Sequence, residues 1–407
     1  MTSVVSPLAP ASFPDMPQIG GVRFATVAAG LRYQGRDDVM LAVLDPGTTL
    51  AGTFTRSATR SAAVLDCQEK IGRDADGGGA AILVNSGNAN AFTGRAGHEA
   101  VAGITGAAAG VLGLSPARIF TSSTGVIGEP LPRERITARL ADLRAGLDAG
   151  GIAAAARAIM TTDTFPKGAT RTVTLGGGEV RIAGIAKGSG MIAPDMATML
   201  VYVFTDAKIG RAELQALVSD VTGRTFNCIT VDSDTSTSDT LLVAATGASG
   251  VDVSGDAGFA AALEEVMLDL ALQVVRDGEG ASKLIEVQVE GAADDVDARR
   301  VALSIANSPL VKTAVAGEDA NWGRVVMAVG KSGAAADRDR LGIRFGSLWV
   351  ARDGARVPDY SEDAASAYMK GQELVIGVDL GLGQGRARVW TCDLTHGYID
   401  INADYRS

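Results

Sequence analysis

The sequence predicts a mixed α/β fold, because segments with strand periodicity and segments with helix periodicity alternate along its length. Residues 80–84 form an unbroken apolar run of the kind found in buried strands. Residues 98–114 are rich in alanine and carry apolar side chains at helical spacing. With 407 residues, 46% of them hydrophobic, the chain is long enough for one large or two medium domains with a substantial core.

The first half continues this alternation up to a strand that follows a glycine-rich turn. Residues 133–147 and 151–160 have helical patterns, and residues 180–186 have a strand pattern. Residues 198–204 carry apolar side chains on both faces, which is typical of a strand deep in a sheet. No linker rich in serine and proline interrupts the chain, so the dividing point that the sequence offers is the peptide bond before Thr198.

The second half contains one long helix and then mainly strands. Apolar residues from Phe259 to Val274 follow i, i+3, i+4, i+7 spacing and predict a buried helix that ends near Gly278. Residues 352–355 predict a turn, and the glycines of residues 381–386 predict a hairpin turn. Strands are expected at residues 284–289, 341–350, 373–379 and 386–392.

Composition narrows the class of protein. A net charge of -10 argues against nucleic-acid and membrane partners, which would favour clustered Lys and Arg. The N-terminal residues lack the pattern of a secretory signal, and no apolar run approaches the roughly 20 residues that span a bilayer, so we expect a cytoplasmic protein. Cys67, Cys228 and Cys392 are too scattered for a disulfide framework. With only His98 and His396, a site of three histidines is impossible, and we expect neither a metal nor another cofactor.

The sequence around Thr198 suggests a nucleophile that the chain makes by cutting itself. Cleavage between Ala197 and Thr198 by an N-to-O acyl shift would give Thr198 a free α-amine beside its hydroxyl. That amine has an ordinary pKa of about 7.7–8.0 and could act as the base without histidine. Gly188, Gly190 and Pro194 allow or impose the unusual backbone that would strain the bond. From the residues alone, a buried strand that simply begins at Thr198 remains an alternative.

Residues 120–128 offer the groups that such a nucleophile needs for an oxyanion hole. Thr124 can present its hydroxyl, and Gly125 can present an unencumbered backbone N–H. A polar turn that caps the next helix is an equally good interpretation of this segment.

Two charged residues are candidates for binding substrate. The Lys187 ammonium suits a substrate carboxylate, although an ordinary surface lysine is the alternative. The Glu279 carboxylate suits a substrate amine, and its alternative is an exposed ion pair with Lys283 four residues later.

Several motifs together resemble one known family. KGSGMIAPDMATML at residues 187–200 resembles the cleavage and nucleophile motif of the ArgJ family of ornithine acetyltransferases, also called glutamate N-acetyltransferases. Other segments resemble the family in the same order, and together they cover essentially the whole chain. They are NSGNAN (85–90), STGVIG (123–128), MTTDT (160–164), DGEGASK (277–283), NSPLVKT (307–313), NWGR (321–324) and YIDINADY (398–405).

The resemblance implies a DmpA/ArgJ-like fold made as a self-cleaved precursor with an N-terminal threonine nucleophile. Cleavage between Ala197 and Thr198 would give an alpha chain, residues 1–197, and a beta chain, residues 198–407, held together as an α2β2 heterotetramer. Thr198 would be the nucleophile, and Thr124 and Gly125 would form the oxyanion hole. The substrate contacts that carry over are Thr164, Lys187, Thr198, Glu279, Asn402 and Ser407.

The implied reaction is transfer of the acetyl group from N2-acetyl-L-ornithine to L-glutamate through acetyl-Thr198, a step of arginine biosynthesis. The resemblance leaves open whether acetyl-CoA is a second donor, and whether Thr161 or Thr162 replaces Thr164 as a contact. Asp195 stands where the family often has asparagine. A hydrolase that uses water as acceptor, and a binding protein that never cuts itself, are the competing interpretations.

Overall fold

The computed structural model describes residues 4–73, 77–193 and 199–403, which form two compact units. The larger unit comprises Pro10–Asn227 and Asp234–Val274. The smaller unit comprises the chain up to Ala9, Cys228–Ser233 and the chain from Val275 onward. Both units combine sheets and helices, so the predicted mixed α/β class is confirmed. Within the described residues, no helix has the length and apolarity needed to cross a membrane.

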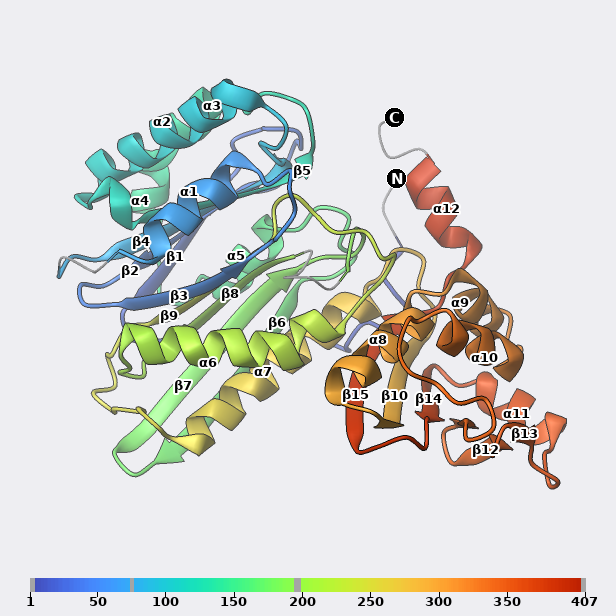
Figure 1. Ribbon diagram of the computed structural model, residues 1–407. Helices are drawn as coiled ribbons and strands as arrows, with labels where there is room; N and C mark the ends of the chain where they lie inside the picture. The colour runs from blue at the N-terminus through green and yellow to red at the C-terminus, as the bar shows by residue number, and fades with distance from the viewer. Residues whose placement is uncertain (1–3, 74–76, 194–198, 404–407) are drawn as a thin grey trace. The chain divides into compact units, whose positions relative to one another are not determined.

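The larger unit is built on two sheets (Figure 1). The four-stranded sheet has the order β1-β2-β4-β5, and the five-stranded sheet has the order β3-β9-β8-β7-β6. The first sheet consists of β1 (Val22–Val27), β2 (Val39–Leu44), β4 (Ala80–Asn88) and β5 (Ile119–Val126). The second consists of β3 (Thr49–Phe54), β6 (Lys167–Leu175), β7 (Gly178–Lys187), β8 (Leu200–Thr205) and β9 (Thr240–Ala245).

The two sheets share a core because alternate strand residues point to opposite faces. The rings of Phe24 on β1 and Phe204 on β8 meet edge to face, with centroids 5.0 Å apart. Met40 belongs to this core, whereas its neighbour Leu41 belongs to a second core with Ile104 of helix α2 (Gly94–Leu112). Each strand of the four-stranded sheet therefore has buried residues on both faces, and this burial fixes the register of the strand.

Helices cover the outer faces of these sheets (Figure 1). Helix α2 lies over the four-stranded sheet. Helix α7 (Ala257–Arg276) packs on β7, where a side chain at Gly184 would lie 2.8 Å from Leu270. The other helices of this part are α1 (Ala62–Ile71), α3 (Arg133–Thr137), α4 (Leu140–Ala145), α5 (Ile152–Ala158) and α6 (Arg211–Arg224), with short 3-10 turns η1 (Pro116–Arg118) and η2 (Phe226–Cys228).

The smaller unit contains one sheet of order β13-β12-β11-β14-β10-β15 and the helices that pack on it. The strands are β10 (Leu284–Ala292), β11 (Gly342–Phe345), β12 (Leu348–Arg352), β13 (Ala355–Arg356), β14 (Glu373–Asp379) and β15 (Gly385–Cys392). The helices that pack on the sheet are α8 (Asp295–Ala306), α9 (Pro309–Ala316), α10 (Trp322–Gly330) and α11 (Glu362–Met369). Helix α12 (His396–Ala403) also belongs to this unit but has no buried residue.

Two of the sequence motifs begin helices in this unit. The Ser308 side chain caps α9 by accepting the Val311 N–H, and Pro309 occupies its first turn. The Asn321 side chain caps α10 by accepting the Arg324 N–H. NSPLVKT and NWGR are therefore explained at least partly as helix starts.

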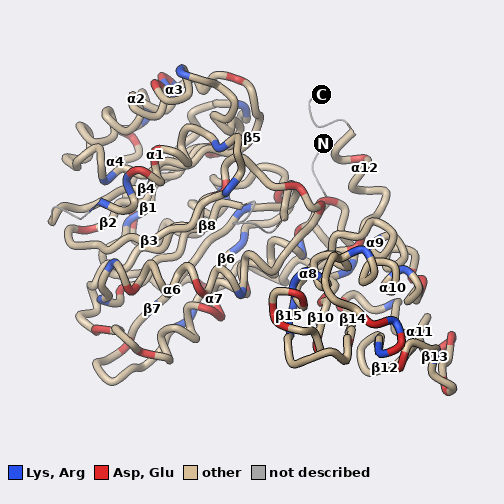
Figure 2. The backbone as a smooth tube through the Cα atoms, in the orientation of Figure 1, with Lys and Arg blue, Asp and Glu red and all other residues tan. Residues whose placement is uncertain are grey.

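Basic and acidic residues are interspersed along the chain (Figure 2). Several form exposed pairs one helical turn apart, such as Arg95 with Glu99 at 2.9 Å. Such pairs contribute about 0.3–0.5 kcal/mol each, so they do not decide the fold.

Most of the expected elements are present, and three expectations are wrong. The helix expected at residues 133–147 is split into α3 and α4, although Ile136, Leu140 and Leu143 keep a buried stripe. The strand expected at residues 341–350 is a hairpin of β11 and β12, because Gly346 takes a φ of +57° between them. The loop at residues 381–386 is not a hairpin turn, since β10 lies between β14 and β15.

Candidate active site

Thr124 and Gly125 lie near the carboxyl end of β5 and not in a helix-capping turn. Strands β4 and β5 run parallel, with Gly87 opposite Gly125. Gly125 has a φ of +131°, and a side chain there would place its Cβ 2.3 Å from the Gly87 carbonyl carbon. Only glycine fits this position, which leaves the backbone beside Thr124 without an obstructing side chain.

Lys187 is the last residue of β7 and is buried, with 9% of its surface exposed. Its ammonium donates to the Thr124 hydroxyl at 3.5 Å. The alternative of an ordinary surface lysine is therefore wrong. The structure brings together two site residues that the sequence could only propose separately.

Asp163 holds this arrangement from the other side and was not among the site residues that the sequence indicated. Its side chain is completely buried and accepts a hydrogen bond from the Lys167 ammonium at 2.7 Å. It also accepts the N–H groups of Thr161 at 2.9 Å and Gly188 at 2.6 Å, and Lys187 Nζ lies 3.9 Å away.

The charge state of Asp163 follows from these neighbours. Burial raises its pKa, but the ammonium groups of Lys167 and Lys187 more than offset this and hold the pKa below its ordinary value. Asp163 is thus a carboxylate at neutral pH. The i, i+4 spacing of Asp163 and Lys167 was the one signal in the sequence that could have indicated it.

Thr164 follows Asp163 in the loop before β6 and is half-buried. Its position next to Asp163 is compatible with the predicted substrate contact, and that contact stays a prediction.

Glu279 and Asn402 meet in the smaller unit. The Asn402 amide donates to a Glu279 carboxylate oxygen at 2.7 Å, and Glu279 is 8% exposed. The alternative of an exposed pair with Lys283 is wrong, because Lys283 instead donates to the carbonyl oxygens of Met369 and Gly371 at 3.0 and 3.1 Å.

The loop that carries Glu279 fits closely against the start of α12. Gly280 has a φ of +74°, and a side chain there would lie 2.5 Å from the Tyr398 nitrogen. The Thr395 hydroxyl donates to the Gly280 carbonyl oxygen at 2.7 Å. These contacts orient α12 so that Asn402 reaches Glu279. No periodicity in the sequence predicts them.

Comparison with known proteins identifies the family. The family model described as "ArgJ family" matches residues 23–407. The chain is 71% identical over 403 residues to "Arginine biosynthesis bifunctional protein ArgJ" of Ruegeria pomeroyi, covering 99% of this chain and 98% of that protein. The chain belongs to the ArgJ family. A protein of the same name from Agrobacterium fabrum is 56% identical over the full length of both chains.

Two solved structures of ArgJ-type proteins are also similar. One is the arginine biosynthesis bifunctional protein ArgJ of Bacillus halodurans, at 43% identity over 51% of this chain and 100% of that chain, with a TM-score of 0.48. The other is the ornithine acetyltransferase of Mycobacterium tuberculosis in complex with ornithine, at 34% identity over 44% of this chain and 93% of that chain, with a TM-score of 0.40.

The remaining site residues of this ArgJ-family chain lie outside the described residues. They are Ala197 and Thr198 at the predicted cleavage site and Ser407 at the end of the chain. Their roles stay predictions. Within the described residues, no three His, Cys, Asp or Glu side chains lie close enough together to hold a metal ion.

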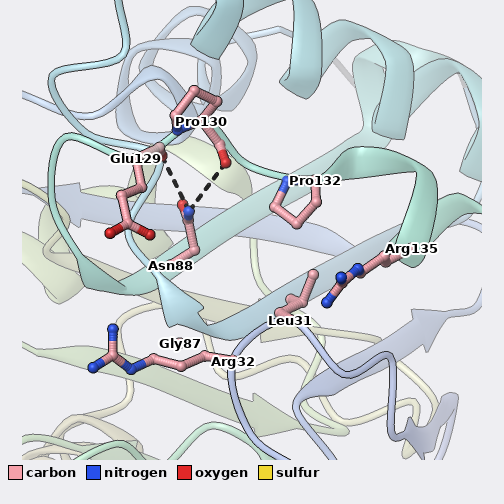
Figure 3. A pocket seen from close by; sticks show the side chains of 8 residues that line it. All are labelled: Leu31, Arg32, Gly87, Asn88, Glu129, Pro130, Pro132 and Arg135. Atoms are coloured by element: carbon pink, nitrogen blue, oxygen red, sulfur yellow. Dashed lines mark hydrogen bonds between the residues drawn. The ribbon is translucent and has the colours of Figure 1, made fainter.

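A pocket of about 200 Å³ lies at the end of β4, where Gly87 and Asn88 line it (Figure 3). Gly87, opposite Gly125, forms part of its wall, and Asn88 donates to the carbonyl oxygen of Glu129 at 3.1 Å. Side chains of both signs line it, including Arg32, Glu129 and Arg135. No motif in the sequence indicated this pocket.

Proposed function

We propose that this ArgJ-family chain transfers the acetyl group of N2-acetyl-L-ornithine to L-glutamate, giving L-ornithine and N-acetyl-L-glutamate. The reaction recycles the acetyl group within arginine biosynthesis. The family match over residues 23–407 and the 71% identity to an arginine biosynthesis protein support the proposal.

The observation that carries the proposal is the contact between Lys187 and Thr124. A hydroxyl suited to stabilise an oxyanion lies 3.5 Å from an ammonium group suited to bind a substrate carboxylate. Both proposed substrates are amino acids with an α-carboxylate. One buried cation at this point can therefore bind either of them with the acyl group beside Thr124.

The proposed mechanism has two half-reactions with an acyl-enzyme between them. Thr198 Oγ attacks the acetyl carbonyl and its proton passes to the α-amine of Thr198, while the Thr124 hydroxyl and the Gly125 N–H donate to the oxyanion. The tetrahedral intermediate collapses, and ornithine leaves with the proton on its amine. The neutral amine of glutamate then attacks the carbonyl of acetyl-Thr198, and the bond between this carbon and Thr198 Oγ breaks. The proton lost by the amine passes through the α-amine of Thr198 to Oγ, which forms N-acetylglutamate and restores the threonine hydroxyl.

The α-amine of Thr198 requires the chain to cut itself between Ala197 and Thr198, giving residues 1–197 and 198–407. Strand pairing supports a stable product of this cut. Strand β7 precedes the bond and β8 follows it, and the two pair antiparallel from Ile182 opposite Thr205 to Lys187 opposite Leu200. Since this ladder needs no covalent link between the strands, the fragments stay together after cleavage. We propose their assembly as an α2β2 heterotetramer in the cytoplasm.

Two of the proposed substrate contacts are charged. In the larger unit, Lys187 binds the α-carboxylate. In the smaller unit, the Glu279 carboxylate, held by Asn402, accepts a hydrogen bond from the α-nitrogen, which is an amide N–H in N2-acetylornithine and an amine in glutamate. The other proposed contacts are Thr164, Thr198 and Ser407. On this assignment, substitutions of Lys187 or Glu279 impair both half-reactions, because both substrates share the amino-acid head.

An acetyl-transfer assay on the purified, cleaved protein tests the function. N-acetylornithine as donor and glutamate as acceptor should give parallel double-reciprocal lines, as expected for a ping-pong mechanism. Release of acetate without transfer to glutamate would show a hydrolase instead. The same assay with acetyl-CoA as donor decides whether the chain also makes N-acetylglutamate from that second source.

A further inference from the structure

Asp163 connects the proposed substrate lysine to the buried framework of the larger unit. It lies in the loop before β6, while Lys187 and Gly188 lie at the end of β7. Its carboxylate contacts all of these segments and is completely shielded from solvent. A fully buried carboxylate is costly unless ammonium groups and N–H donors surround it, and here both surround it.

We infer that Asp163 is a positioning residue, which holds the Lys187 ammonium beside the Thr124 hydroxyl so that Lys187 can bind the substrate carboxylate. The inference rests on the proposed function, because that proposal makes Lys187 a substrate contact. The role that we assign to Asp163 is in substrate binding, through Lys187, and not in the chemical step.

The two carboxylate oxygens of Asp163 have different tasks. Oδ1 accepts from the Lys167 ammonium at 2.7 Å and from the Gly188 N–H at 2.6 Å. Oδ2 accepts from the Thr161 N–H at 2.9 Å and faces Lys187 Nζ at 3.9 Å. Three short hydrogen bonds thus fix the orientation of the carboxylate, and the oxygen that faces Lys187 cannot rotate away.

The 3.9 Å separation between Asp163 Oδ2 and Lys187 Nζ suits a residue that positions the ammonium without forming a hydrogen bond to it. It is too long for a hydrogen bond, so the attraction is Coulombic and strong in a buried setting. The attraction holds the Lys187 ammonium near the Thr124 hydroxyl, to which it donates at 3.5 Å.

Lys167 completes the arrangement from the interior. Its side chain is completely buried, and its ammonium lies 4.8 Å from the centre of the Phe165 ring. Lys167 cannot reach solvent, so it acts as the permanent counter-ion of Asp163, whereas Lys187 is 11% exposed at its side chain. One lysine fixes the carboxylate, and the carboxylate fixes the other lysine.

A double-mutant cycle tests this order of action. Asp163→Asn keeps the size of the side chain and an oxygen acceptor but removes the charge. It should cleave itself normally and raise KM for both N-acetylornithine and glutamate by about tenfold, with kcat changed less than about threefold. In the Lys187→Met background, Asp163→Asn should leave KM unchanged, because there is no ammonium left to position.

Asp66→Asn is the matched control. Asp66 forms another pair at i, i+4 spacing in the same unit, with Lys70 Nζ at 2.6 Å, and takes no part in the proposed site. Its KM values should equal those of the wild type. If Asp163→Asn fails to fold, Asp163→Asn with Lys167→Met removes the stranded ammonium as well, and the same rise in KM is expected.

The results separate the two proposals. A wild-type protein that transfers no acetyl group would defeat the proposed function, and this inference with it. A wild type that is active, with KM unchanged in Asp163→Asn, would overturn only the positioning role. Two other results would also overturn the positioning role, because Asp163 would then act independently of Lys187. One is that the effects of Asp163→Asn and Lys187→Met on KM multiply. The other is a soluble Asp163→Asn protein that stays uncleaved.

Discussion

The Lys187 ammonium lies 3.5 Å from the Thr124 hydroxyl, across 63 residues of sequence. The contact joins the ends of β7 and β5, which belong to different sheets of the larger unit. Packing of one sheet on the other therefore decides the distance between the proposed carboxylate-binding and oxyanion groups. The substitutions below each alter either this arrangement or the contact between Glu279 and Asn402 in the smaller unit.

Replacing Thr124 should impair chemistry more than binding. Thr124→Val removes the hydroxyl while keeping the shape, and kcat should fall about 10²-fold because an oxyanion donor is lost. Steady-state kinetics on the cleaved protein measures this. Thr124→Ser keeps the hydroxyl and should retain most of the activity. Equal losses in both variants would show that the hydroxyl is not the important group.

Replacing Gly125 should destabilise the fold. Gly125→Ala places a methyl group 2.3 Å from the Gly87 carbonyl carbon, so β4 and β5 must move apart. We expect a loss of about 3 kcal/mol in the free energy of unfolding, measured by denaturant titration.

Gly128→Ala is the control for this backbone effect. Gly128 also has a positive φ, of +89°, but a side chain there meets no atom within 4 Å. Its cost should be limited to about 1–2 kcal/mol of backbone strain. A Gly125→Ala protein as stable as Gly128→Ala would contradict the close approach of β4 and β5.

Loss of Asp163 should reduce stability over a defined pH range. Its pKa is held below the ordinary value, so the ionised group stabilises the fold above about pH 4, and this contribution is lost as the pH falls. Asp163→Asn should cost about 3–5 kcal/mol, since it leaves buried ammonium groups without their partner. Denaturant titration should find the same loss at about pH 6 and pH 8, and a smaller one near pH 3. A loss that grew toward low pH would contradict the direction of the pKa shift.

A second carboxylate at Asn402 should weaken substrate binding. Asn402→Asp replaces the amide that lies 2.7 Å from Glu279 with a like charge, and KM should rise about tenfold for both substrates. Ile399→Asp adds the same charge on the same helix at a position that is 63% exposed, and should leave KM unchanged. If both variants raised KM alike, net charge on α12 would be responsible, and not the contact with Glu279.

Local periodicity predicted the elements that pack regularly. Helix α7 and strand β8 appeared where the apolar pattern placed them, because burial on a stripe or on both faces leaves a mark in the sequence. The turn at Gly346 and the placement of β10 between β14 and β15 were missed. Both depend on which strands pair, and pairing between distant segments leaves no local mark.

The candidate site shows the same limit. Motif resemblance named Thr124, Lys187, Glu279 and Asn402, and the structure places these residues in two close pairs. The motif resemblance could not show that Lys187 is buried. Nor could it identify Asp163, whose importance comes from neighbours in other segments that only folding brings together.

The proposed mechanism depends on an acetyl group carried by Thr198, which mass spectrometry can detect. Cleaved protein is mixed with N-acetylornithine in the absence of glutamate, quenched in acid and digested. We expect the peptide beginning at Thr198 to gain the mass of one acetyl group and to lose it when glutamate is added before quenching. Continued transfer of acetyl groups to glutamate, with no acetyl group ever found on that peptide, would rule out the acetyl-Thr198 mechanism.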